Sequence, residues 1–134
     1  MNQQEIMRLL PHRDNMLLVD QAEVCPQEGE EQRPTRCKGS YTVTGEEWFL
    51  KGHFPGNPVM PGVLQIEAMA QTAGAIVSCA KEDYAERKAG VLFMSIDGVK
   101  FRKPVKPGDQ LRMHVEKIKA RRNVYAVSYT HLTL

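Results

Sequence analysis

The chain has 134 residues, of which 42% are apolar and 25% are charged. This composition excludes disordered and collagen-like classes and predicts a single domain over residues 1–134. Three cysteines without a CxxC spacing argue against a disulfide framework and against a zinc site, so no metal is expected. With neither a signal peptide nor a membrane span expected, we predict a soluble cytoplasmic domain.

Helical and strand-like patterns follow one another along the chain. Residues 3–10 predict a short amphipathic helix that ends at Pro11, and residues 16–24 and 35–44, which are rich in β-forming residues, predict two strands. Further strands are expected over 90–101, 109–119 and 121–129. Together with one long helix over about 61–80, this order predicts an α+β fold with an antiparallel sheet.

The long helix carries an unusual polar stripe. Its residues are apolar nearly all round, which predicts burial on most sides. Glu67, Gln71, Gly74 and Ser78 nevertheless fall on one narrow stripe at the helical period. Glu67 is therefore either hydrogen-bonded into a structural network or a carboxylic acid that faces a pocket.

A loop rich in glycine and proline, residues 52–62, leads into this helix. The first amides of the helix, those of Gly62, Val63 and Leu64, are expected to be free donors with partial positive charge around them. They could hold a phosphate or polarise a carbonyl oxygen that gains charge as an enolate forms. With His53 in the loop and Glu67 about a turn into the helix, the residues suit adding or removing water beside a carbonyl.

Positive charge is concentrated near the C-terminal end. Residues 100–122 hold nine of the 18 basic residues and only two acids, although the net charge is only +2. This stretch is either a solvated strand face or a docking surface for an acidic partner. Nucleic acid is not expected as a partner, because no recognition motif and little aromatic interleaving are present.

Three segments together resemble a known family. They are GHFPGNPVMPGVLQIEAMAQTAG (52–74), LLPHRDNMLLVD (9–20) and FMSIDGVKFRKPVKPGDQL (93–111), and they resemble the β-hydroxyacyl-[acyl carrier protein] dehydratases of type II fatty acid synthesis. The resemblance implies a hot-dog fold, in which a curled antiparallel sheet surrounds the long helix. It also implies a homodimer, in some members a trimer of dimers, with active sites at the dimer interface.

The same resemblance implies roles for individual residues. His53 of one subunit and Glu67 of the other are the expected catalytic pair, and the amide of Gly62 or Val63 is expected to bind the thioester oxygen. The substrate is a (3R)-3-hydroxyacyl thioester on acyl carrier protein, the product is the trans-2-enoyl thioester, and no metal or redox cofactor takes part. Glutamate rather than aspartate at position 67 implies the branch that dehydrates without isomerising.

Two further groups of residues are predicted on this basis. The acyl-tunnel candidates, each also a possible core residue, are Val59, Met60, Ile66, Met69, Ala70 and Phe93. The candidates for docking the carrier protein are Lys100, Arg102, Lys103 and Lys106.

Two alternatives and one departure from the family remain. The alternative enzymes are a hot-dog acyl thioesterase and an enoyl-thioester hydratase, and a non-catalytic thioester-binding module is the alternative outside the enzymes. Residues 128–134 do not resemble the family's continuation, so we expect the chain to lack the family's last strand. That loss would leave unpaired backbone at a sheet edge.

Overall fold

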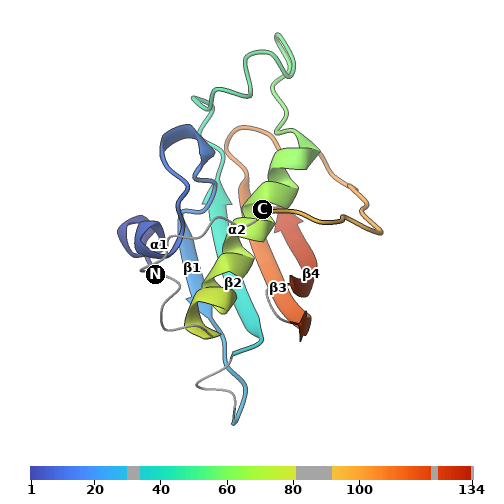
Figure 1. Ribbon diagram of the computed structural model, residues 1–134. Helices are drawn as coiled ribbons and strands as arrows, with labels where there is room; N and C mark the ends of the chain where they lie inside the picture. The colour runs from blue at the N-terminus through green and yellow to red at the C-terminus, as the bar shows by residue number, and fades with distance from the viewer. Residues whose placement is uncertain (30–33, 81–91, 122–123, 134) are drawn as a thin grey trace.

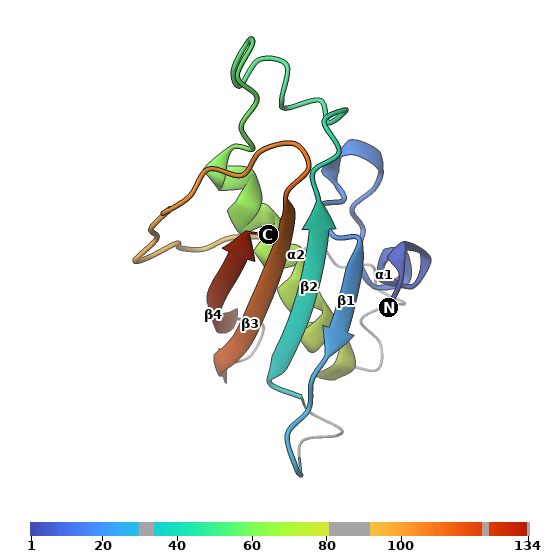
Figure 2. The same ribbon diagram turned by 180° about the vertical axis from the view of Figure 1, so that it is seen from behind.

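The computed structural model describes residues 1–29, 34–80, 92–121 and 124–133. Within these ranges four strands form one antiparallel sheet in the order β1-β2-β3-β4. The long helix α2 lies across one face of this sheet, and the short helix α1 lies beside β1 (Figures 1 and 2). The elements are α1 (Gln3–Leu9), a 3-10 turn (Asp14–Met16), β1 (Gln21–Val24), β2 (Arg36–Thr42), α2 (Gly62–Ala80), β3 (Gln110–Arg121) and β4 (Val124–Thr133).

The sheet is amphipathic because its residues alternate. In β3, the side chains of Leu111, Met113 and Val115 are buried, whereas those of Arg112 and His114 are exposed. Successive strand residues point to opposite faces, so the apolar set faces α2 and the polar set lies on the other face. The apolar layer between the sheet and α2 contains the main core cluster, and a second core cluster adds Ile6 of α1 and Leu10.

A close approach between α2 and β2 sets the position of the helix. A Cβ atom added at Gly39 would lie 2.5 Å from Thr72 Oγ1 and 2.7 Å from Thr72 Cγ2. Thr72 is itself buried, and its hydroxyl donates to the carbonyl oxygen of Ala68. Because only glycine leaves this space, the middle of α2 can lie directly on the centre of the sheet.

The long helix was predicted over about 61–80 and is confirmed, as are the short N-terminal helix and a strand within 35–44. The strand predicted over 16–24 is regular only from Gln21 to Val24. Leu18, although buried, directs its backbone N–H to Oε1 of Gln71 at 2.8 Å and not to a neighbouring strand. The side chain of Gln71 on α2 thus satisfies a backbone N–H that a neighbouring strand would satisfy in a regular sheet.

The strand predicted over 90–101 is wrong for the part that the structure describes, since residues 92–101 form no strand. Residues 90 and 91 lie outside the described ranges. The segment runs on the β4 side of α2, away from the sheet (Figures 1 and 2), and Leu92 and Met94 are 88% and 80% exposed. Strand propensity reflects the fit to a half-buried pleated surface, and here the segment has no such surface to join.

The last two strands are longer than predicted. The expected ranges were 109–119 and 121–129, whereas β4 continues to Thr133, which pairs with Leu111 of β3. Residues 128–133, which do not resemble the family's continuation, therefore lie in the edge strand of the sheet, and residue 134 lies outside the described ranges. None of the helices in the described ranges has both the length and the apolar character needed to cross a bilayer.

Candidate active site

Arg13 holds the segment that follows α1, residues 10–13, in place through three hydrogen bonds. Its guanidinium donates to the carbonyl oxygens of Met7 at 2.8 Å, Leu10 at 2.7 Å and His12 at 2.7 Å. A cation at the C-terminal end of a helix satisfies carbonyl groups that the helix leaves unpaired. The same segment packs against α2 where Leu10 meets Gly74. A Cβ atom added at Gly74 would lie 2.5 Å from Leu10 Cδ2. Arg13 and the Leu10–Gly74 approach together hold His12 over α2.

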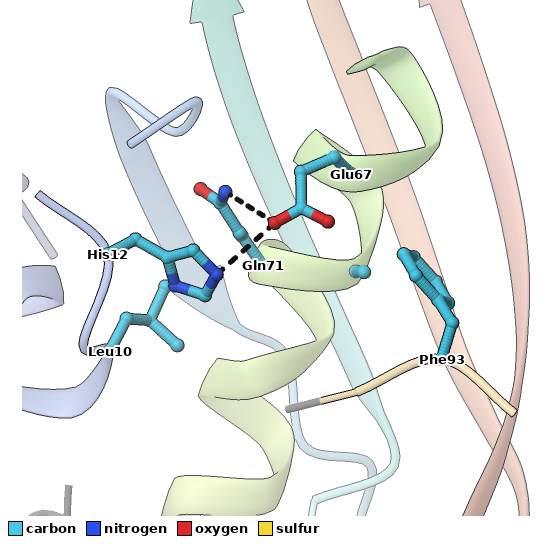
Figure 3. A pocket seen from close by; sticks show the side chains of 6 residues that line it. Leu10, His12, Glu67, Gln71 and Phe93 are labelled. Atoms are coloured by element: carbon cyan, nitrogen blue, oxygen red, sulfur yellow. Dashed lines mark hydrogen bonds and ion pairs between the residues drawn. The ribbon is translucent and has the colours of Figure 1, made fainter. Parts of the chain in front are cut away.

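Glu67 lies in a pocket beside this segment. The pocket is lined by Leu10, His12, Glu67, Ala70, Gln71 and Phe93 (Figure 3). Nε2 of His12 lies 3.2 Å from Oε1 of Glu67, and Nε2 of Gln71 donates to the same oxygen at 3.0 Å. The Glu67 side chain is 21% exposed. The sequence left open whether Glu67 is networked or faces a pocket, and in the structure it does both.

Tyr129 of β4 lies near Glu67 and belongs to the partly buried residues that pack against the core. Burial, together with the nearby Glu67 carboxylate, raises the pKa of Tyr129 to about 12. Its phenol is therefore protonated at neutral pH. On the β4 side, Glu67 therefore has a neutral hydroxyl group as a neighbour.

His53 is fixed within the loop that precedes α2. Its Nδ1 lies 2.8 Å from the carbonyl oxygen of Val59, and the Val59 N–H donates back to the His53 carbonyl oxygen at 2.8 Å. The ring of Phe54 stacks on the imidazole with the centroids 4.0 Å apart. Because a carbonyl oxygen can only accept, Nδ1 must be the donor, so in the neutral ring the lone pair lies on Nε2.

The start of α2 offers two of the three predicted amide donors. Among the described residues, the amides of Gly62 and Val63 have no hydrogen-bond partner, and the Val63 side chain is 72% exposed. The prediction for Leu64 is wrong, because its N–H donates to the carbonyl oxygen of Pro61 at 3.0 Å. A tight first turn satisfies that amide within the helix itself. A Cβ atom at Gly62 would lie 2.7 Å from Phe101 Cζ, so a larger residue there would displace the exposed Phe101 ring.

The acyl-tunnel candidates separate into two groups. Ala70 and Phe93 line the pocket with Glu67. Met60, Ile66 and Met69 are buried in the main core cluster, which matches their alternative reading as core residues. Val59 is half-buried and holds His53 in place. The four docking candidates, Lys100, Arg102, Lys103 and Lys106, are all exposed.

The structure brings Glu67 together with His12 and Gln71, but His53 is not among the residues that line this pocket. His12 is absent from the sequence-predicted site, although it lies within the LLPHRD segment that carries the family resemblance. The sequence signal that could have found it is the Pro-His-Arg run that directly follows the short N-terminal helix. No group of three His, Cys, Asp or Glu side chains in the described ranges is arranged to hold a metal ion.

The antiparallel sheet packed on one long helix defines a hot-dog domain, and a family model for the FabA-like domain matches residues 10–134. The chain is 50% identical over 124 residues to the 3-hydroxyacyl-[acyl-carrier-protein] dehydratase FabZ of Geotalea uraniireducens, covering 92% of this chain and 81% of that protein. It is 48% identical over 125 residues to the protein of the same name from Geobacter metallireducens, covering 92% and 78%. The chain therefore belongs to the FabZ family of dehydratases, which confirms the resemblance drawn from its motifs.

A solved structure agrees at the level of the fold. The dehydratase heterocomplex ApeI:P from Xenorhabdus doucetiae matches with a TM-score of 0.52 and 24% sequence identity, over 73% of this chain and 72% of that one. The predicted α+β hot-dog fold is thereby confirmed.

Proposed function

We propose that this protein removes water from (3R)-3-hydroxyacyl-[acyl carrier protein] to give the trans-2-enoyl thioester in fatty acid biosynthesis. The observation that carries the proposal is the Glu67 carboxyl group, which faces a pocket on the central helix of a chain that belongs to the FabZ family. A carboxyl group held between a buried network and a pocket is suited to transfer a proton.

The chemistry assigned to each group follows from its position. Nε2 of His53 takes the proton from the carbon next to the thioester, and the amides of Gly62 and Val63 stabilise the negative charge that develops on the thioester oxygen. Glu67 gives a proton to the β-hydroxyl group. The C–O bond then breaks, water leaves, and the electron pair of the former C–H bond becomes the new C=C bond. Elimination changes no net oxidation state, so the reaction needs no redox partner.

A complete site requires a second subunit. His53 lies outside the pocket that contains Glu67, which supports a homodimer in which each site combines His53 of one subunit with Glu67 of the other. The exposed apolar side chains of 92–101 support the same arrangement, because a large exposed apolar patch marks an interaction surface. We further propose that the dimers assemble into a trimer of dimers and that the protein is located in the cytoplasm.

The carrier protein is proposed to dock on the basic side of this surface. Lys100, Arg102, Lys103 and Lys106 are exposed and follow directly on the apolar segment 92–99. Acyl carrier protein is acidic as a family, so these side chains would attract it and orient its arm toward the site.

One experiment separates this function from its alternatives. The purified protein is incubated with 3-hydroxyacyl and trans-2-enoyl thioesters of acyl carrier protein, and mass spectrometry follows the loss or gain of one water. Interconversion of the two thioesters supports the dehydratase. Release of a free acid would instead identify a thioesterase, and no reaction with either would favour a binding module.

A further inference from the structure

We propose that His12 and Gln71 are positioning residues for Glu67, and that they keep its transferable proton on Oε2, the oxygen that faces the pocket. The inference rests on the proposed function, in which Glu67 is the acid. Its basis is the pattern of hydrogen bonds around the two carboxyl oxygens, which differ sharply in their surroundings (Figure 3).

The amide of Gln71 has only one possible orientation. Its Oε1 accepts from the backbone N–H of Leu18 at 2.8 Å, and its Nε2 donates to the carbonyl oxygen of Met16 at 2.7 Å. Two backbone groups of known polarity therefore decide which end carries the hydrogens. The second hydrogen on Nε2 is directed to Oε1 of Glu67 at 3.0 Å. Since an NH2 group only donates, Oε1 of Glu67 must accept.

His12 contacts the same oxygen. Its Nε2 lies 3.2 Å from Oε1 of Glu67, whereas its Nδ1 is buried with no hydrogen-bond partner in the described part of the chain. A hydrogen on Nδ1 would be a buried donor without an acceptor, which native proteins avoid. The hydrogen therefore lies on Nε2, and His12 is a second donor to Oε1.

The two donors decide which oxygen can carry a proton. A carboxyl oxygen that accepts from both Gln71 and His12 has no place for a hydrogen of its own, so a proton on Glu67 is confined to Oε2. In Figure 3, Oε2 points away from His12 and Gln71, to the side of the pocket where Phe93 lies. Tyr129 of β4, a titratable neighbour among the described residues, is protonated at neutral pH and does not compete for this proton. Rigid positioning of this kind is worth a large factor in rate when reacting groups must meet in one geometry.

The first test reads the hydrogen positions directly and does not depend on activity. The protein is labelled with ¹⁵N-histidine, and long-range ¹H–¹⁵N spectra show which ring nitrogen of each of the four histidines carries the hydrogen. The signals of His12 are identified by their loss in His12→Gln. We expect the hydrogen on Nε2 in His12 and on Nδ1 in His53, which makes His53 an internal contrast. A hydrogen on Nδ1 of His12 with a bare Nε2 would overturn the proposal.

The second test measures coupling between His12 and Glu67. His12→Leu removes the donor at similar size, and His12→Gln keeps an amide N–H near the position of Nε2. We expect His12→Leu to lower kcat about 10- to 100-fold with little change in KM, and His12→Gln to restore most of the loss. In a Glu67→Gln background, His12→Leu should cost less than about twofold, because His12 acts only through Glu67.

The outcomes distinguish the two proposals. An equal loss from His12→Leu in both backgrounds would mean that His12 supports the fold and does not position Glu67. If the wild-type protein does not interconvert the two thioesters, the proposed function fails, and the NMR result still decides whether His12 donates to Glu67 as stated. Should His12→Leu fail to fold, the NMR result on the wild-type protein decides the inference by itself.

Discussion

Nδ1 of His53 lies 2.8 Å from the carbonyl oxygen of Val59, and the backbone N–H of Val59 returns a hydrogen bond of the same length to His53. These two hydrogen bonds join the two ends of the segment from His53 to Val59, and they hold the imidazole in one orientation. It also separates the two ring nitrogens by role, since Nδ1 is used to fix the ring and Nε2 remains for chemistry. The loop before α2 therefore holds the imidazole proposed as the base in a defined geometry.

His53→Ala should abolish dehydration and leave the fold intact. The imidazole is half-buried in a surface loop and belongs to neither core cluster, so its removal takes away the base without opening the core. Turnover of the 3-hydroxyacyl thioester and the thermal unfolding midpoint are measured on the same preparation. Near-normal turnover in a folded variant would contradict the role assigned to His53.

Glu67→Gln should lower turnover by about 10²–10⁴-fold, the usual range for one acid–base group. Glutamine keeps the shape of the side chain but cannot supply the proton. The thermal unfolding midpoint is measured beside the rate, because the new amide also changes the contact with Gln71. If the rate were nearly unchanged, Glu67 would have only a structural role.

The shared site can be tested by mixing two inactive proteins. Subunit exchange between His53→Ala and Glu67→Gln homodimers makes about half of the dimers mixed when pairing is random, and each mixed dimer has one site with both changes and one with neither. About a quarter of all sites should then regain full activity. Exchange is confirmed with two different affinity tags. Verified exchange without recovered turnover would show that both residues act within one chain.

Reversing the charge of two or three of Lys100, Arg102, Lys103 and Lys106 should weaken the use of carrier-protein substrate more than the use of a small pantetheine thioester. These exposed side chains would act by attracting the acidic carrier, and screening should shrink the loss as salt is raised. The comparison is of kcat/KM for the two substrates at low and high salt. Equal losses for both substrates would mean that the residues do not dock the carrier.

Gly39→Ala should destabilise the protein by about 1–3 kcal/mol, the usual cost of overpacking a core. The new methyl group would lie 2.5 Å from Thr72 Oγ1, so α2 must move away from β2. Gly52→Ala is the matched control, because nothing lies within 4 Å of a Cβ atom at that position. The free energy of unfolding in urea is measured for both variants. Equal stability of the two would show that the close contact between α2 and β2 is readily relieved.

Much of the fold could be predicted because it depends on local patterns. The run from 63 to 80 is too apolar and too long to be anything but a buried helix, and the alternation of Leu111, Met113 and Val115 specifies which face of β3 is buried. The segment 92–101 shows the limit of this reasoning. Its aromatic and β-branched residues favour a strand. A strand also needs a neighbour for its backbone, and local sequence does not say whether one is present.

The candidate site also has a part that the sequence predicts and a part that only the tertiary structure shows. The sequence by itself determined the family, the presence of His53 and Glu67, and a group of candidate amide donors at the start of α2, from which the structure removes Leu64. Motifs and helix starts are properties of consecutive residues, so they can be found without the fold. Only the tertiary structure decided that His12 and Gln71 hold one oxygen of Glu67, and that His53 lies outside this pocket. Contacts between segments far apart in the chain depend on how the helix and the N-terminal segment pack, so they follow from the whole fold.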